Sequence, residues 1–317
     1  MIFSNLVESY NIGLIRGAKE QDPLFTYNYV KKEDINFDGS ISIKNNITTI
    51  KNRVYNSNFK LAESLAQNTN NILDNTENLI KITAGSKSLR SMETENMSVV
   101  LNELVNTSSY LVNAYVMDQS GMQIYKTTGN LGDRSDRGYF QKAINGKANF
   151  SSVIISRSRE VPIVVYARPI KKDNNIVGVI GVSIDLGGLS ELASNISAGN
   201  SGYGFIVEQS AKTIAHPEEK YVQEMKDASN LTPVKKVIDG HKGTTLYTYN
   251  GEEKLSAYVP IEKTGWGAVV QLPSKEAFSD VRKSIWRTVL IIGITILIGM
   301  IAAYYLGNSI THPILGA

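Results

Sequence analysis

The sequence predicts an α+β protein: a long N-terminal helix, then two antiparallel sheets, then one C-terminal transmembrane helix. Three observations lead to this prediction. Apolar residues recur at helical spacing through residues 43–86, with no proline or glycine before Gly85. Short runs rich in Val, Ile and Tyr follow, separated by turns that contain Asp, Asn or Gly. Residues 288–306 carry no charged side chain.

The composition argues against several classes of protein. The chain has 317 residues, 20% charged and 42% hydrophobic, and its net charge of +3 is too small to indicate a nucleic-acid partner. It contains no cysteine, which excludes disulfides and thiolate chemistry. It has three histidines and no P-loop, GxSxG or HExxH motif. We therefore expect neither an enzyme nor a cofactor.

Residues 1–42 are polar and show no clear period, so they are expected to be irregular. Asp34, Asn36 and Asp38 match the first half of an EF-hand loop and are candidate calcium ligands. However, Asn45 stands at the twelfth position, where a bidentate carboxylate is normal. The alternative interpretation is a simple turn before the helix. No other metal site is expected.

The expected helix over residues 43–86 has an apolar heptad seam. One heptad position holds Ile47, Val54, Leu61 and Ile82, and the other holds Leu65, Ile72 and Leu79. Asn58, Asn68 and Asn75 interrupt the seam, and polar residues at such positions can fix the register of a dimer. The pattern predicts a homodimer through this helix. The alternative is a helix that packs against its own domain.

The two expected sheets divide the middle of the chain. The first module covers residues 87–198 and the second covers residues 199–273, and they join near Ala198–Gly202. Their strands are short and closely spaced, which suits antiparallel pairing better than a βαβ succession. Residues 274–287 are expected to form a helix that connects the second sheet to the apolar segment.

Residues 288–306 are long enough to cross a bilayer, since at 1.5 Å per residue they span roughly 30 Å. Trp286, Tyr304 and Tyr305 flank the segment, as interfacial aromatic residues do. No earlier stretch is apolar enough to span, and the start of the chain lacks the features of a signal peptide. Because Arg and Lys precede the segment, flanking charge alone would place the N-terminal part in the cytoplasm.

Several stretches resemble the double Cache sensor region of bacterial transmembrane receptors, chiefly methyl-accepting chemotaxis proteins. They are DRSDRGYFQKAINGK (133–147), VPIVVYARPI with IVGVIGVSIDL (161–186), SGYGFIVEQSAKTIAHP (201–217) and TGWGAVVQLPSKEAF (264–278). ITHPI (310–314) is similar to the opening of a HAMP linker, expected over residues 307–317. The resemblance implies two PAS-like sheets beside one long helix, with residues 87–198 farther from the membrane. It also implies a missing first membrane helix, and hence a piece of a longer protein.

In this family the membrane-distal module usually holds the ligand, so the resemblance implies site residues there. Arg137 offers a planar fork suited to a carboxylate. Tyr139 and Phe140 would form flat walls, and by the resemblance Tyr115 and Tyr166 would lie on strands that face the same region. The alternative for Arg137 is a surface ion pair with a neighbouring aspartate, Asp133 or Asp136.

The sequence departs from the pattern of the amino-acid-binding members. They carry a tyrosine five residues before the arginine, an Arg-x-Trp-Tyr run and an aspartate that meets the ligand's ammonium group. Gly132, Tyr139-Phe140 and Ser183 stand there instead, although Asp185 could replace the aspartate. An unpaired ammonium group is costly to bury. We therefore expect a small carboxylate or another polar metabolite, with an α-amino acid as the alternative. His216 is expected to be structural.

The resemblance implies the extracytoplasmic, ligand-sensing region of a homodimeric transmembrane chemoreceptor, with a small-molecule ligand and the lipid bilayer as its partners. Ligand would favour one of two balanced arrangements and move the helix over residues 274–306 by roughly an ångström or two. Alternative hypotheses are the sensor region of a membrane histidine kinase or of a cyclic-nucleotide signalling protein. A membrane-anchored hydrolase and a structural protein are further alternatives.

Overall fold

The computed structural model describes the backbone of residues 40–157 and 159–311, and the side chains of residues 48–157 and 159–306. The calcium candidates Asp34, Asn36 and Asp38 lie outside the described residues, and so do the side chains of the expected HAMP segment, residues 307–317. Ile47, the first residue of the heptad seam, has a described backbone only.

The first element is the long helix α2 (Ser40–Ala84), followed by α3 (Lys87–Arg90) and α4 (Thr94–Asn106). The buried face of α2 includes three threonines spaced by seven residues, Thr69, Thr76 and Thr83. Each hydroxyl donates to the backbone carbonyl four residues earlier, at 2.8 Å. Small polar side chains can therefore face the core without an unsatisfied donor.

The first sheet contains six strands. They are β1 (Leu111–Met117), β2 (Gln123–Lys126), β3 (Asn149–Phe150), β4 (Ile154–Ile155), β5 (Pro162–Lys172) and β6 (Asn175–Asp185). The order is β2-β1-β6-β5-β3, with β4 also on β5, and every pair is antiparallel. Asp173 and Asn174 both have positive φ between β5 and β6, as a tight hairpin turn requires. The helix α5 (Gly138–Ile144) follows the loop after β2.

The second sheet has five strands, reached through α6 (Leu186–Ser194). They are β7 (Tyr203–Val207), β8 (Thr213–Ala215), β9 (Gly243–Tyr249), β10 (Glu252–Ile261) and β11 (Trp266–Pro273), with α7 (Glu219–Gln223) and α8 (Thr232–Ile238) between β8 and β9. The order is β8-β7-β11-β10-β9. Apart from β4, the two sheets share one plan, in which the last strand lies between the first strand and the one before it.

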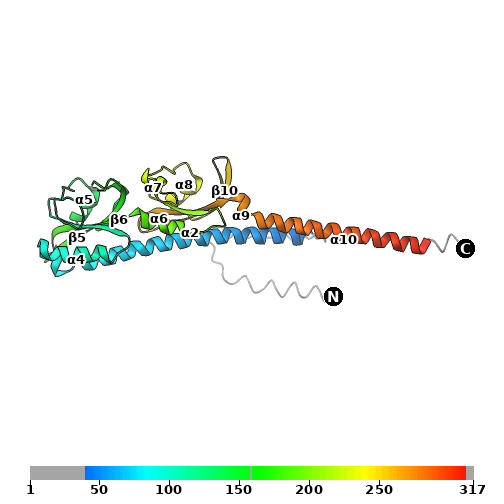
Figure 1. The fold of residues 1–317 in the computed structure, drawn as a ribbon, viewed down its shortest axis with the longest axis horizontal. Helices are drawn as coiled ribbons and strands as arrows, with labels where there is room; N and C mark the ends of the chain where they lie inside the picture. Colours follow the sequence, from blue (N-terminus) through cyan, green and yellow to red (C-terminus); the bar gives the residue numbers. More distant parts are fainter. Residues whose placement is uncertain (1–39, 158, 312–317) are drawn as a thin grey trace. The chain divides into compact units, whose positions relative to one another are not determined.

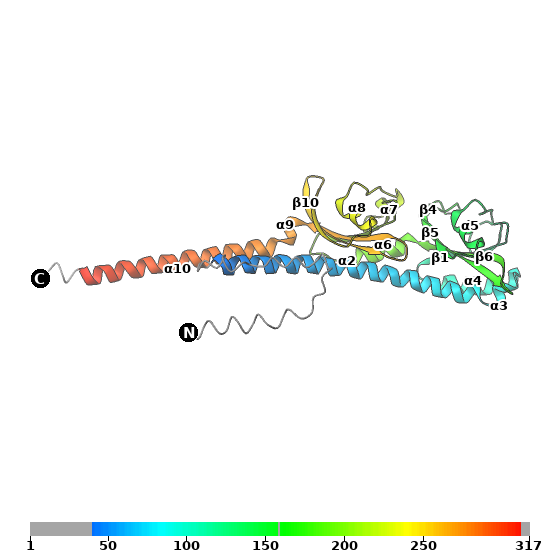
Figure 2. The same cartoon turned by 180° about the vertical axis from the view of Figure 1, so that it is seen from behind.

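One face of α2 packs against both sheets (Figures 1 and 2). Ala62, Leu65 and Leu73 lie in one core with residues of the second sheet. Ile80 and Ala84, farther along the helix, lie in another core with α4 and the first sheet. The opposite face of each sheet has its own smaller cluster, formed with α5 in the first and with α8 in the second.

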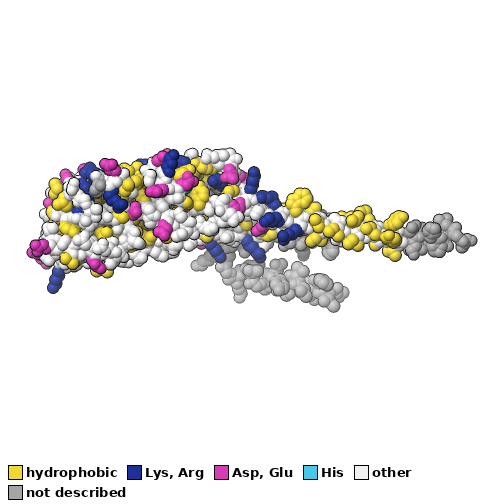
Figure 3. Space-filling model, viewed as in Figure 1, with side chains coloured by type: hydrophobic (Ala, Val, Ile, Leu, Met, Phe, Trp, Pro, Cys, Tyr) yellow, Lys and Arg dark blue, Asp and Glu magenta, His cyan; other side chains and the backbone are white. Residues whose placement is uncertain are grey.

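The chain ends in α9 (Ser274–Ala277) and α10 (Ser279–Thr311). Among the described residues, one helix segment, Ser279–Leu306, is long and apolar enough to cross a membrane. Its most apolar 18-residue stretch has a mean hydropathy of 2.4 and is not buried within the structure. Figure 3 shows the apolar surface of this helix beyond the Lys and Arg side chains near its start. The connecting helix and the apolar segment are therefore parts of one helix from Ser279 onward.

A carboxylate links α9 to the loop before β7. Glu276 accepts hydrogen bonds from the N–H groups of Asn200 and Ser201 and from the Ser201 hydroxyl, and these bonds lower the pKa of its carboxyl. Gly199 has a φ of +68°, and a Cβ there would collide with the Glu276 carboxylate. The loop after α6 is thus bound to the short helix that precedes α10.

We predict that Leu65→Ala will lower the free energy of unfolding by about 2–5 kcal/mol, because Leu65 is fully buried between α2 and the second sheet. Leu131→Ala is the matched control, since this leucine is 55% exposed and should change stability by less than about 0.5 kcal/mol. Urea unfolding followed by circular dichroism measures both. Equal effects of the two substitutions would contradict the packing described.

Candidate functional site

A small cavity lies on the face of the first sheet that points away from α2. Alternation along the strands places Tyr115 of β1, Val165 of β5 and Ser183 of β6 on this face. Its volume is about 30 Å³, enough for one or two water molecules. The lining residues are Asn113, Tyr115, Gln123, Lys126, Arg134, Arg137, Tyr139, Ile154, Ile155, Ser156, Arg157, Ile163, Val165 and Ser183.

Two tyrosine hydroxyls meet in this cavity. Tyr115 on β1 and Tyr139 on α5 are both buried, and their hydroxyl oxygens are 3.2 Å apart in a hydrogen bond. Burial raises the pKa of Tyr115 well above its usual value. Burial also raises the pKa of Tyr139, although the nearby Arg134, Arg137 and Arg157 oppose that shift. Both phenols are therefore neutral at physiological pH. Because the Tyr115 hydroxyl donates to that of Tyr139, the Tyr139 hydroxyl keeps its proton for an anion.

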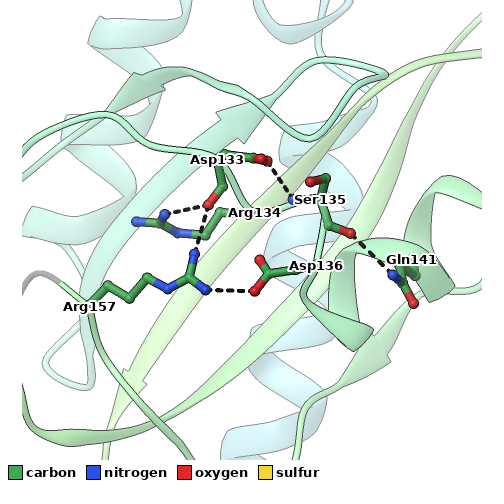
Figure 4. A network of polar contacts seen from close by, with 6 residues as sticks. All are labelled: Asp133, Arg134, Ser135, Asp136, Gln141 and Arg157. Atoms are coloured by element: carbon green, nitrogen blue, oxygen red, sulfur yellow. Dashed lines mark hydrogen bonds and ion pairs between the residues drawn. The ribbon is translucent and has the colours of Figure 1, made fainter.

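Arg137 is the N-cap residue of α5 and lines the cavity. Its Nε atom is buried and has no hydrogen-bond partner among the residues that the structure describes. The expected alternative partners are engaged elsewhere (Figure 4): Asp136 pairs with Arg157 at 2.6 Å, and the Asp133 carboxylate accepts the Ser135 N–H at 2.8 Å. A buried donor without a partner costs about 1–3 kcal/mol, so a ligand that accepts this hydrogen bond gains correspondingly.

Three more cations surround the same cavity. Arg134 and Arg157 both donate to the backbone carbonyl of Asp133, at 2.7 and 3.1 Å (Figure 4). Lys126 on β2 completes the set, and burial together with the charge of Arg134 lowers its pKa. None of the described lining residues is Asp or Glu. The site is therefore strongly positive.

The structure brings most of the sequence-predicted site residues together. Those that line the cavity are Tyr115, Arg137, Tyr139 and Ser183. Phe140 is buried in the cluster under α5 and is not among the lining residues. Asp185 lies at the N-cap of α6 and is not among the residues that line the cavity.

The expectation for Tyr166 is corrected, because this residue lies on the other face of the sheet. Its ring packs against Phe150 at a centroid distance of 4.6 Å, in the core that includes α2 residues. The reason is strand alternation: Ile163 and Val165 of β5 face the cavity, so Tyr166 must face the helix. The sequence-based prediction did not include Lys126, Arg134 and Arg157, although Arg134 lies between the two aspartates of the run DRSDR.

A second cavity of about 30 Å³ lies against the second sheet and is lined by Tyr203, His216, Tyr221 and other residues. The His216 ring stacks on Tyr221 at 4.3 Å, and its Nδ1 accepts the Glu218 N–H at 2.9 Å. Burial lowers the pKa of His216. These contacts give His216 a packing role. Among the described residues, no cluster of His, Asp or Glu could hold a metal ion.

Comparison with known proteins decides the family, because a family model described as the Cache domain matches residues 46–281. The chain belongs to the Cache-domain family. It is also 30% identical over 137 residues to the methyl-accepting chemotaxis protein TlpA of Bacillus subtilis (strain 168), a match that covers 43% of this chain and 20% of TlpA. The chain thus spans about a fifth of that relative.

Solved structures with this Cache fold include two ligand complexes. The ligand-binding domain of the Pseudomonas fluorescens chemoreceptor CtaA with L-isoleucine has a TM-score of 0.59 and 21% identity, covering 73% of this chain and 97% of that one. The ligand-binding domain of Mlp24 with asparagine has a TM-score of 0.60 and 18% identity, covering 76% and 99%. The predicted resemblance to a Cache region of methyl-accepting chemotaxis proteins is confirmed.

We predict that Gly181→Ala will damage the cavity. A Cβ at Gly181 of β6 would lie 2.5 Å from the ring of Tyr115, so the ring must move into the cavity. The expected loss of stability is about 1–3 kcal/mol. Gly138→Ala is the control, because nothing lies within 4 Å of its Cβ position. Thermal unfolding compares the two; an unchanged Gly181→Ala protein would contradict the close packing of Tyr115.

Proposed function

We propose that this chain is the extracytoplasmic, ligand-sensing region of a transmembrane chemoreceptor. In this proposal the two sheets are tandem PAS-like modules of a double Cache region, with residues 87–198 distal from the membrane and residues 199–273 proximal. Membership of the Cache family and the shared strand order support it. The observation that carries it is the unpartnered, buried Nε of Arg137 in a cavity with two tyrosine hydroxyls.

The ligand that the cavity suits best is a small carboxylate. The Arg137 fork can bind it in a bidentate manner, while Tyr139, whose hydroxyl accepts from Tyr115, donates from the side. An α-amino acid is the second candidate, because the similar structures of CtaA and Mlp24 hold L-isoleucine and asparagine. Its ammonium group would find Ser183 where a carboxylate is expected. A cavity of about 30 Å³ must widen to admit either ligand.

A continuous series of elements could pass a ligand signal to the membrane. Ser183 lines the cavity near the end of β6, which leads directly into α6. The loop after α6 is hydrogen-bonded to Glu276 on α9, immediately before α10. A ligand that binds one arrangement of these elements more tightly shifts the population toward that arrangement, by no more than its difference in affinity. Residues 288–306 would then carry the shift across the bilayer.

The outward face of α2 supports the proposal of a homodimer. Leu65 of the heptad seam is fully buried within its own chain, so that part of the seam cannot serve a partner. Ile82, by contrast, is 74% exposed, and Leu61 and Ile72 are only partly covered. In this proposal the apolar stripe for a second copy consists of the exposed Ile82 together with Leu61 and Ile72, which also pack against the chain's own core. A kinase or cyclic-nucleotide output would use the same sensor; the similarity to TlpA favours chemotaxis.

We predict that Arg137→Ala will abolish binding of a carboxylate ligand, a loss of at least a hundredfold in affinity, with little change in melting temperature. The reason is that Arg137 makes no ion pair with a described residue, so the fold loses little. A thermal-shift screen of organic acids and amino acids finds ligands, and calorimetry then compares variants. Arg159→Ala, an exposed arginine outside the cavity lining, is the control. A collapse of the fold would make Arg137 structural instead.

We predict that residues 41–284 will sediment as a dimer and that Ile82→Lys will weaken the association at least tenfold, since it places a charge in the proposed interface. Val99→Lys on α4 is the matched control, because Val99 is 72% exposed and lies outside the α2 stripe. Analytical ultracentrifugation across a concentration series measures both. A wild-type fragment that stays monomeric at high concentration, or equal effects of the two substitutions, would rule the interface out.

A further inference from the structure

The charges around the cavity of the first sheet define the chemical class of its ligand more closely than the proposed function does. Resting on that function, we propose that the ligand is a small dicarboxylate without an ammonium group, and that Arg134 is the residue that selects for its second carboxylate. Arg134 lines the same cavity as Arg137 and precedes it by three residues.

The cations outnumber the carboxylates by two. Four cationic side chains line the cavity: Lys126, Arg134, Arg137 and Arg157. The carboxylates of the adjoining network are those of Asp133 and Asp136, and neither lines the cavity. The six side chains therefore carry an excess of two positive charges. A monoanion would neutralise one of them, whereas a dianion neutralises both, and like charges in a partly desolvated site repel strongly.

Two of the lining arginines have no carboxylate partner among the described residues. The Arg157 guanidinium forms an ion pair with Asp136 at 2.6 Å, so its charge is matched (Figure 4). Arg134 donates to the Asp133 carbonyl at 2.7 Å, which is a neutral acceptor and leaves its charge unmatched among the described residues. Arg137 keeps a buried, unpartnered Nε. Each of these two guanidinium groups can bind one carboxylate with two hydrogen bonds.

The position of Arg134 relative to the tyrosines is consistent with this role. Its charge opposes the rise in pKa of both Tyr115 and Tyr139, whose hydroxyls are hydrogen-bonded to each other inside the cavity. Arg137 acts on Tyr139 in the same way. Both guanidinium groups thus act on Tyr139, and Arg134 also acts on Tyr115. Apolar side chains of Ile154, Ile163 and Val165 remain to contact a short hydrocarbon spacer between the carboxylates.

An ammonium group has no place in this arrangement. The described lining residues include no carboxylate, and Ser183 stands where the amino-acid receptors have an aspartate. Asp185 lies outside the lining at the start of α6. An ammonium group would therefore be buried among cations with no opposite charge to pair with, which is costly. A dicarboxylate should be preferred to the α-amino acid of the same length.

Three probes of nearly equal size separate the effect of a second carboxylate from the effect of an ammonium group. Succinate carries two carboxylates, butyrate carries one, and L-aspartate is succinate with an added ammonium group. Isothermal titration calorimetry on the full chain in lipid nanodiscs, at pH 7.5 and constant ionic strength, compares them, with inorganic phosphate as a general anion. We expect succinate to bind at least tenfold more tightly than each of the other three.

The variants assign the two roles. Arg134→Gln should lower the affinity for succinate at least tenfold and that for butyrate less than threefold, whereas Arg137→Gln should remove the binding of both. Arg159→Gln, outside the lining, should change neither. If the Arg134→Gln variant melts early, Lys126→Gln provides a second test of the charge balance. It should lower the affinity for succinate by less than the loss expected for Arg134→Gln. Circular dichroism checks the fold of each variant.

The possible outcomes separate this inference from the function on which it rests. Tighter binding of aspartate or butyrate than of succinate, lost in Arg137→Gln, would overturn the dicarboxylate assignment and leave the carboxylate sensor standing. Phosphate binding as tight as succinate binding would indicate a general anion site and also overturn it. Failure of all four probes would overturn the dicarboxylate assignment, and a wider screen without any Arg137-dependent ligand would overturn the proposed function as well.

Discussion

The packing of one face of α2 against both sheets is the constraint on which the rest of the structure depends. Because α2 covers one face of each sheet, only the opposite face can form a cavity with its own loops and short helices. Leu65 joins the helix to the second sheet, and Ile80 joins it to the first. Three threonines spaced by seven residues lie in this interface, and each hydroxyl is satisfied by a carbonyl of the helix itself.

Local sequence patterns were enough to predict the elements of the fold, but not which face of each strand packs against α2. Helical spacing without proline or glycine was enough to predict α2, and the absence of charge over residues 288–306 was enough to predict the apolar helix. The strands followed from short Val- and Ile-rich runs between turns. Which face of a strand meets α2 depends on tertiary packing, and Tyr166 was assigned to the wrong face for that reason. Its alternation with Val165 could have revealed the error once one cavity residue was known.

The site itself was only partly predictable. Arg137, Tyr139 and Tyr115 came from a family resemblance, and the structure brings them to one cavity. The gathering of Arg134, Arg157 and Lys126 was not predictable, since it depends on how the loop before α5 folds back toward β2 and β4. The pairing of Asp136 with Arg157, which leaves Arg137 without an aspartate, also depends on that loop. Local sequence suggested instead that the adjacent Asp136 would pair with Arg137.

The central claim is that Arg137 receives a carboxylate in the cavity of the first sheet, and a crystal structure with a bound ligand tests it most directly. Residues 46–281, which the Cache-domain model matches, are the natural boundaries for crystals grown with the tightest ligand found. The account predicts one carboxylate within about 3 Å of the Arg137 guanidinium, with its Nε–H donating and a Tyr139 or Tyr115 hydroxyl alongside. A ligand in the second sheet, or an Arg137 side chain turned into bulk water beside an occupied site, would contradict it.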